Sequence, residues 1–330
     1  MRISTLDLTN DGVTLTAYVL DASNEMPNAR TRPAVLIFPG GAYRACSDRE
    51  AEPVAMSFLA EGYHAFVLRY SLNGNAAFPK PLNDAEEALE LIRMRSEEWH
   101  VDPEKVAVCG FSAGGHLAAA LGTMGRVRPN AMILGYPCIV ASMGDILPAP
   151  IPGVDEAVDS LTPPAYIFHT YEDTLVPVGN ALAMAAAMDR ERRPFELHIF
   201  QNGAHGLSLS RPVTSGGMRS LSDPDAAKWF GLCVAWLRNQ FGEFAADRDS
   251  VLLSETVAEY SVDIQLGVLW KNDACRKLVL GKLPMLEESP QLKDAMGVPL
   301  RTIIEFGGGL LTNEDVLDLD QQLKEIQVIS

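Results

Sequence analysis

Residues 106–121 read Val-Ala-Val-Cys-Gly-Phe-Ser-Ala-Gly-Gly-His-Leu-Ala-Ala-Ala-Leu. The first four are a short apolar run, which is typical of a strand buried on both faces. Gly110, Ser112 and Gly114 then form a Gly-x-Ser-x-Gly pattern, and a run of small residues typical of a helix follows. This strand–turn–helix order predicts that Ser112 projects from a tight bend, where the helix N-terminus favours developing negative charge. The alternative is a glycine-rich connection that merely contains a serine.

Composition and charge limit the class of protein. The chain has 330 residues, of which 47% are hydrophobic and 21% charged, which predicts one large globular domain and a smaller appendage. The formal net charge of −16 argues against nucleic acid and anionic membranes as partners. The first residues lack the apolar core of a signal peptide, and no run reaches transmembrane length. Five scattered cysteines suggest neither a disulfide framework nor a metal site, so we expect a cytoplasmic protein.

Strand and helix patterns alternate along most of the chain. We expect strands at 13–20, 33–38, 64–70, 106–109, 131–134, 165–169 and 195–200, and helices at 52–61, 81–99, 112–123, 180–190 and 228–241. This alternation predicts an α/β fold with a mostly parallel sheet and helices on both faces. Right-handed crossovers then place an active site at the carboxyl edge of the sheet.

The pattern changes near residue 250. Strand runs fade, and short helical segments broken by glycine and proline take over, including the run Gly307-Gly308-Gly309. We therefore expect an α/β domain over residues 1–245 and a small helical module over residues 250–330. The module packs either on the main domain or on a second copy of the chain, and the sequence leaves both alternatives open.

A serine hydroxyl needs an adjacent base that is itself oriented by a carboxylate. Ser112, Asp173 and His205 each follow a predicted strand, in the order nucleophile, acid, base. His205 lies in a glycine-flanked loop, which suits a base better than the positions of the other five histidines. Glu172 remains the alternative acid. His169 ends a strand just before Asp173, and we expect it to line the pocket.

Acyl transfer also needs hydrogen-bond donors for the oxyanion, each contributing roughly 3–4 kcal/mol. Residues 39–42, Pro-Gly-Gly-Ala, follow a predicted strand and offer the backbone amides of Gly41 and Ala42. Ala113, directly after the serine, offers a third amide. We expect Tyr43, which follows this loop, to contact the substrate. The alternative for residues 39–42 is an ordinary Gly-Gly turn.

Together these residues resemble the α/β-hydrolase superfamily, in particular its esterase/lipase branch related to hormone-sensitive lipase. Residues 162–170, 194–200 and 203–206 are similar to motifs of small bacterial acetylxylan-esterase-like enzymes, and the resemblance covers about residues 10–240. It implies a Ser112–His205–Asp173 triad, no metal, no cofactor and a short acyl group, commonly acetyl on a sugar. Pro39 stands where related lipases carry histidine, and Ala42 where they usually carry a third glycine.

The resemblance therefore predicts a serine esterase whose substrate is a small ester, such as an acetylated xylo-oligosaccharide. The helical module is similar to modules appended to some bacterial carbohydrate-active enzymes, which also points toward sugars. Three alternatives stay open: a broad short-chain carboxylesterase, a peptidase on the same scaffold, and a binding module with a vestigial triad. The sequence does not identify the acyl group, the sugar, the oligomeric state or the role of the module.

Overall fold

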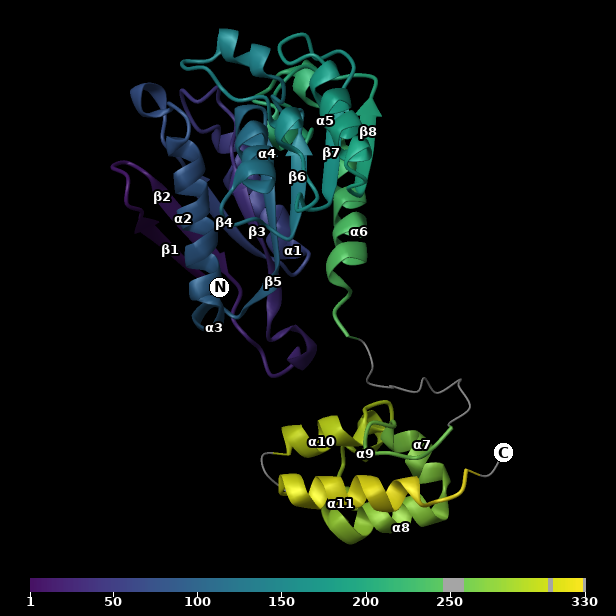
Figure 1. The fold of residues 1–330 in the computed structure, drawn as a ribbon. Helices are drawn as coiled ribbons and strands as arrows, with labels where there is room; N and C mark the ends of the chain where they lie inside the picture. Colours follow the sequence, from purple (N-terminus) through teal and green to yellow (C-terminus); the bar gives the residue numbers. More distant parts are fainter. Residues whose placement is uncertain (246–257, 308–310, 329–330) are drawn as a thin grey trace. The chain divides into compact units, whose positions relative to one another are not determined.

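The computed structural model describes residues 1–245, 258–307 and 311–328. The chain divides into two compact units, Met1–Phe244 and Ala245–Ser330 (Figure 1).

The first unit is built on an eight-stranded sheet with the order β1-β2-β4-β3-β5-β6-β7-β8. Strand β2 pairs antiparallel with both β1 and β4. All neighbouring pairs from β4 to β8 are parallel. This confirms the predicted α/β class with a mostly parallel sheet. The strands are β1 Arg2–Asp7, β2 Thr14–Val19, β3 Arg32–Phe38, β4 His64–Arg69, β5 Val101–Phe111, β6 Ala131–Gly135, β7 Ala165–Thr170 and β8 Phe195–Phe200.

Helices cover both faces of this sheet (Figure 1). Along β3, Leu36 and Phe38 pack into one apolar cluster, whereas Val35 and Ile37 pack into the other, because successive side chains of a strand point to opposite faces. The first cluster includes residues of α2, α4 and α5, and the second includes residues of α1 and α6. The helices are α1 Glu52–Ala60, α2 Lys80–Met94, α3 Ser96–Trp99, α4 Ala113–Met124, α5 Gly179–Arg190 and α6 Trp229–Phe241.

Three elements differ by more than one residue from the sequence-based expectation. The edge strand β1 was not expected, because its side chains are almost all exposed and so form no apolar run. The helix expected over 81–99 is two helices that meet at Arg95. Strand β5 is longer than the apolar run at 106–109, since it begins at Val101. None of these differences moves a predicted site residue off the carboxyl edge of the sheet.

The second unit is helical in its described residues. Leu266, Val279, Leu300 and Leu323 belong to an apolar cluster that contains residues of this unit alone. Thr312 caps its last helix through a reciprocal bond with Asp315. Its helices are α7 Leu266–Lys271, α8 Asp273–Lys282, α9 Leu292–Ala295, α10 Leu300–Phe306 and α11 Asn313–Lys324. Residues 250–257 of the expected module, and the glycines at 308 and 309, lie outside the described residues.

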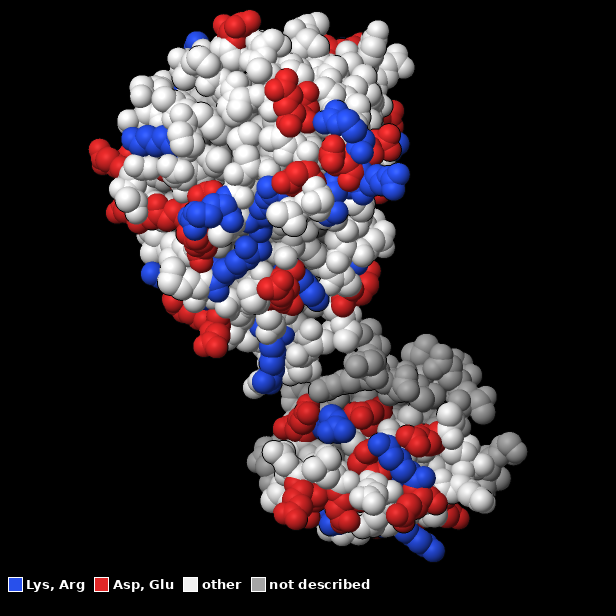
Figure 2. All heavy atoms as spheres, viewed as in Figure 1, with Lys and Arg blue, Asp and Glu red and all other residues white. Residues whose placement is uncertain are grey.

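Acidic and basic side chains are interspersed on the visible face of each unit (Figure 2). No helix within the described ranges combines the length and the apolar character needed to cross a bilayer.

Candidate active site

Ser112 lies on the bend between β5 and α4. Its backbone has φ 55° and ψ −119°, an unusual conformation for a residue with a side chain. The bend requires glycine on both sides, since a Cβ atom at Gly110 would lie 2.0 Å from the carbonyl oxygen of Gly114. A Cβ atom at Gly114 would lie 2.1 Å from the carbonyl oxygen of Phe38 on the neighbouring strand. The Gly-x-Ser-x-Gly pattern is therefore a packing requirement, and it leaves the hydroxyl at the sheet edge.

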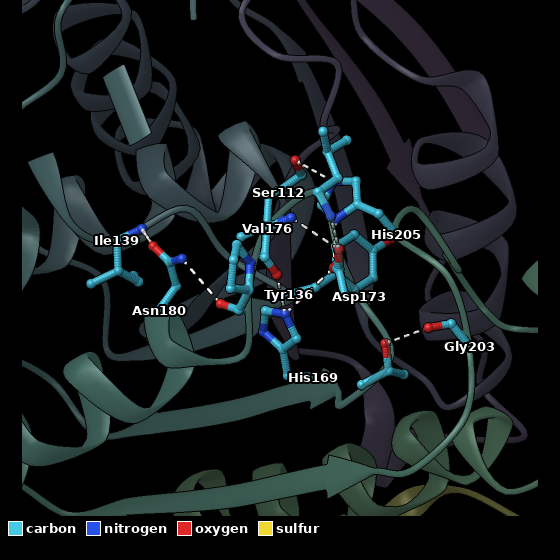
Figure 3. A network of polar contacts seen from close by, with 12 residues as sticks. Ser112, Tyr136, Ile139, His169, Asp173, Val176, Asn180, Gly203 and His205 are labelled. Carbon is cyan, nitrogen blue, oxygen red and sulfur yellow. Dashed lines mark hydrogen bonds and ion pairs between the residues drawn. The ribbon is translucent and has the colours of Figure 1, made fainter. Parts of the chain in front are cut away.

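A chain of hydrogen bonds joins Ser112, His205 and Asp173 (Figure 3). The Oγ atom of Ser112 is 2.8 Å from Nε2 of His205, and Nδ1 of His205 is 2.6 Å from Oδ2 of Asp173. The three residues follow β5, β8 and β7, so the parallel sheet brings its carboxyl ends to one place. A neutral imidazole in this arrangement donates from Nδ1 to the carboxylate and accepts the serine proton at Nε2.

Asp173 is a buried carboxylate with several donors. Burial by itself raises the pKa of Asp173, but hydrogen bonds from His169 and His205 outweigh burial and hold that pKa well below its ordinary value. The amides of Leu175 and Val176 also donate to Oδ1, at 3.0 and 2.9 Å. The group is therefore an anion at neutral pH.

Glu172 lies in a different environment from Asp173. Its Oε2 atom accepts a hydrogen bond from the amide of Gly203 at 3.1 Å, which holds the start of the His205 loop. The structure thus brings Asp173, rather than Glu172, into contact with the imidazole.

The loop at residues 39–42 presents backbone amides beside Ser112. Gly41 has φ 135° and Ala42 has φ 56°, and a Cβ atom at Gly41 would lie 2.1 Å from the carbonyl oxygen of Ala45. Among the described residues, no main-chain acceptor pairs with the amides of Gly41 and Ala42. The amide of Ala113 is the first of α4, so it lacks a partner within the helix. Gly41 and Ala42 line the same pocket as Ser112, so their amides and that of Ala113 are candidate oxyanion donors.

A pocket of about 210 Å³ opens at this site. It is lined by Gly41, Ala42, Ser47, Arg49, Glu50, Ser112, Leu175, His205 and Gly206. Its volume suits a small group next to the serine, because pockets for drug-sized ligands begin at roughly 300 Å³.

The structure corrects the expectation that the side chain of Tyr43 contacts the substrate. Only 1% of Tyr43 is exposed, and its hydroxyl lies 2.9 Å from Nδ1 of the buried His116. The ring packs edge-on against Tyr70 and Phe78. Burying this large ring in the apolar core stabilises the fold, and it removes the ring from the surface of the pocket.

His169 is likewise not at the surface of the pocket. It is fully buried, and its Nε2 atom donates to the carbonyl oxygen of Val176 at 2.8 Å and lies 3.4 Å from Oδ2 of Asp173. Figure 3 shows it on the far side of Asp173 from Ser112. His169 therefore contacts Asp173 on the side away from Ser112. Contrary to the expectation, it does not line the pocket.

The two charged residues that line the pocket, Arg49 and Glu50, were not predicted from the sequence. Glu50 is buried, and its carboxylate accepts hydrogen bonds from the amide of Gly40 and the hydroxyl of Tyr136. Burial raises the pKa of Glu50, and these two hydrogen bonds oppose that rise. Both residues lie in a polar stretch with no motif, so no local pattern could have identified them.

Comparisons with known proteins find both sequence relatives and similar structures. The family model BD-FAE matches residues 20–134. The endo-1,4-beta-xylanase B of Butyrivibrio fibrisolvens is 32% identical over 232 residues, which are 60% of this chain and 36% of that protein. The acetylxylan esterase of Xylanibacter ruminicola is 33% identical over 228 residues, which are 62% of this chain and 46% of that protein. The chain thus spans less than half the length of these two relatives.

Two solved structures match this chain over nearly their whole length. An alpha/beta hydrolase enzyme from a Medee basin deep-sea metagenome library is 48% identical with a TM-score of 0.70, covering 73% of this chain and 98% of its own. An acetyl ester-xyloside bifunctional hydrolase from Caldicellulosiruptor lactoaceticus is 33% identical with a TM-score of 0.60, covering 72% and 92%. This chain therefore belongs to the α/β-hydrolase superfamily.

Proposed function

We propose that the chain is a serine carboxylic ester hydrolase with Ser112 as nucleophile, His205 as base and Asp173 as the acid that orients it. The observation that carries the proposal is the unbroken hydrogen-bond chain from Oγ of Ser112 to the buried carboxylate, at a pocket that Gly41 and Ala42 also line. Relatives named as esterases support the same activity.

In the proposed mechanism, Oγ of Ser112 attacks the ester carbonyl carbon while Nε2 of His205 takes the hydroxyl proton. Asp173 keeps the imidazole in the required tautomer and stabilises the imidazolium that forms. The amides of Gly41, Ala42 and Ala113 donate to the oxyanion. When the intermediate collapses, His205 protonates the departing alcohol oxygen. Water then attacks the acyl-enzyme with the same base, and Ser112 is released.

For the substrate, we propose a short acyl ester, with acetylated xylo-oligosaccharides or other acetylated sugars first. The small volume of the pocket, which Leu175 helps to line, supports a short acyl group. The sugar rests on relatives, because two similar proteins are named as an acetylxylan esterase and an acetyl ester-xyloside hydrolase. A screen of acetate release from acetylated xylo-oligosaccharides and peracetylated sugars, against p-nitrophenyl esters of rising chain length, separates this substrate class from a broad carboxylesterase.

The activity itself is tested with a fluorophosphonate probe and with p-nitrophenyl acetate. We expect the probe to label the wild-type chain at Ser112, and Ser112→Ala to abolish both labelling and hydrolysis while the fold persists. Ser57→Ala, which removes a hydroxyl from α1, serves as the matched control and retains both. Hydrolysis that survives in Ser112→Ala contradicts the proposed nucleophile.

A further inference from the structure

Glu50 is a buried carboxylate next to the amides that face the pocket. It ends the short 3-10 helix Asp48–Glu50, and only 3% of it is exposed. Its Oε2 atom accepts a hydrogen bond from the amide of Gly40 at 2.7 Å, and its Oε1 atom accepts one from the hydroxyl of Tyr136 at 2.6 Å. Both oxygens act as acceptors, which is the bonding pattern of an ionised carboxylate. A buried anion is costly, so its position beside the pocket calls for a physical reason.

The first of these bonds holds the peptide unit between Pro39 and Gly40. Its N–H donates to Glu50, while its carbonyl oxygen accepts a hydrogen bond from the hydroxyl of Tyr70 at 2.6 Å. The N–H and C=O of a trans peptide point in opposite directions, so this unit cannot rotate without breaking both bonds. There is also no space for a side chain, because a Cβ atom at Gly40 would lie 2.7 Å from Oε2 of Glu50.

The next two carbonyl groups of the loop are engaged as well. The carbonyl oxygen of Gly40 accepts from the amide of Ser47 at 2.8 Å, and that of Gly41 accepts from the amide of Arg44 at 2.9 Å. Because each carbonyl is held inside the loop, the amides of Gly41 and Ala42 point the other way. The bond from Gly40 to Glu50 is thus the first link in the chain of contacts that directs these two amides.

The second bond of Glu50 leads toward the base. The hydroxyl of Tyr136 donates to Glu50 and accepts from the amide of Ser208 at 2.8 Å. The Tyr136 ring lies edge-on to the imidazole of His205, with ring centroids 5.2 Å apart. The neighbouring Arg49 donates to the carbonyl oxygen of Gly206 at 2.9 Å. One short segment therefore contacts both the loop of the oxyanion donors and the loop of the base.

We propose that Glu50 is a positioning residue for the ester hydrolysis proposed above, and the inference rests on that function. Its carboxylate holds the 39–42 loop with the amides of Gly41 and Ala42 directed at the pocket before substrate arrives. Through Tyr136 it also restrains the ring of His205. Donors held in place beforehand need no reorganisation as the oxyanion forms, so the effect falls on the chemical step.

Two substitutions at Glu50 test this role. Glu50→Gln keeps the size and one acceptor, whereas Glu50→Met removes both acceptors. We expect the kcat for p-nitrophenyl acetate, per site titrated with fluorophosphonate, to fall about tenfold in Glu50→Gln and about a hundredfold in Glu50→Met. We expect KM to change little in both. A purely structural role would lower the number of titratable sites and leave the kcat of each site intact.

Glu86→Gln is the matched control. Glu86 on α2 is also a buried carboxylate that accepts a hydrogen bond from a backbone amide, that of Arg126. Ser112 precedes the first residue of α4, whereas Arg126 follows the last. Because α4 has twelve residues, it is about 18 Å long and separates this contact from Ser112. We expect its kcat per titrated site to equal that of the wild type.

The outcomes separate the two proposals. A wild-type chain that neither hydrolyses esters nor reacts with the probe contradicts the proposed function itself. If the wild type is active, and Glu50→Met has the same kcat per site or differs from the wild type only in KM, then the role of Glu50 alone is contradicted. Should Glu50→Met fail to fold in a thermal denaturation scan, the nearly isosteric Glu50→Gln decides by the same criterion.

Discussion

Two histidines and two backbone amides converge on the carboxylate of Asp173. His205 bonds one oxygen at 2.6 Å, and the amides of Leu175 and Val176 bond the other. The adjacent Glu172 instead accepts a hydrogen bond from the amide of Gly203. Adjacent residues along a loop point to different sides, and this difference decides whether the predicted acid Asp173 or the alternative Glu172 contacts His205.

Replacing these two acids separately tests the assignment. We expect Asp173→Asn to lower kcat about 10⁴-fold, because the amide cannot hold the imidazole in the tautomer that accepts the serine proton. We expect Glu172→Gln to stay near the wild-type kcat, since its amide oxygen still accepts from Gly203. Steady-state kinetics with p-nitrophenyl acetate measures both. The reverse ranking would assign the acid to Glu172.

Residue-level expectations failed where burial decided the outcome. Tyr43 follows the glycine loop directly, and its proximity in sequence suggested a contact with the substrate. Its ring is instead buried against Tyr70 and Phe78, which come from other parts of the chain. His169 was expected to line the pocket and is enclosed behind Asp173. Sequence position places a backbone near a site, but packing decides where its side chain goes.

At the scale of elements, the strands buried on both faces were the most predictable. β3, β6 and β7 appear as continuous apolar runs because helices cover both sides of the sheet. The exposed edge strand β1 has no such run and was missed. The turn after β5 was predictable for another reason, since its glycines are required by contacts within a few residues and with the adjacent strand.

Adding a methyl group to that turn tests the packing argument. Gly114→Ala would place its Cβ atom 2.1 Å from the carbonyl oxygen of Phe38, so we expect the free energy of unfolding to fall by about 1–3 kcal/mol or more. Gly231→Ala in α6 is the control, because nothing lies within 4 Å of its Cβ position and alanine favours helix by up to about 1 kcal/mol. Urea denaturation measures both variants. Equal stability of Gly114→Ala and the wild type would contradict the close contact.

At the scale of the whole molecule, the two units have separate apolar cores. The two clusters of the first unit draw on residues between Val13 and Phe241, and the cluster of the second draws on residues from Tyr260 onward. Ser112, Asp173, His205 and Glu50 all lie in the first unit. We therefore propose that residues 1–245 are the catalytic domain.

A chain ending at residue 245 tests this division. We expect it to retain the thermal transition of the first unit and the kcat of the full chain for p-nitrophenyl acetate, because every group proposed for the chemistry remains. Calorimetry and steady-state kinetics on both lengths make the comparison. An unfolded or inactive short chain would show that residues after 245 complete the domain.

The stability of the first unit should depend on pH through two buried histidines. Burial lowers the pKa of His64 and of His116 from 6.5 to about 4. Between these pH values the unfolded chain binds protons that the folded chain excludes. The contribution of each histidine to the free energy of unfolding is therefore fully present above about pH 6.5. It declines as the pH falls toward 4, by at most about 1.4 kcal/mol per pH unit for each histidine.

Urea denaturation at several pH values between 4 and 7 measures this slope. His64→Gln removes one titrating group, so we expect a shallower decline in this variant than in the wild type. A wild-type free energy of unfolding that stays constant across the interval would show that both histidines charge freely in the folded chain.

The sequence by itself determined the fold class, and it predicted the serine, acid and base types of the candidate site. These features follow from local patterns: apolar runs that mark buried strands, glycines that a tight bend requires, and polar residues directly after strands. Only the tertiary structure showed that Asp173, and not Glu172, contacts His205. It also placed the Tyr43 side chain in the core and brought Glu50 to the pocket. Glu50 and Tyr136 are 86 positions apart along the chain. Contacts of that kind depend on how strands and loops meet in space, and no single stretch of residues specifies them.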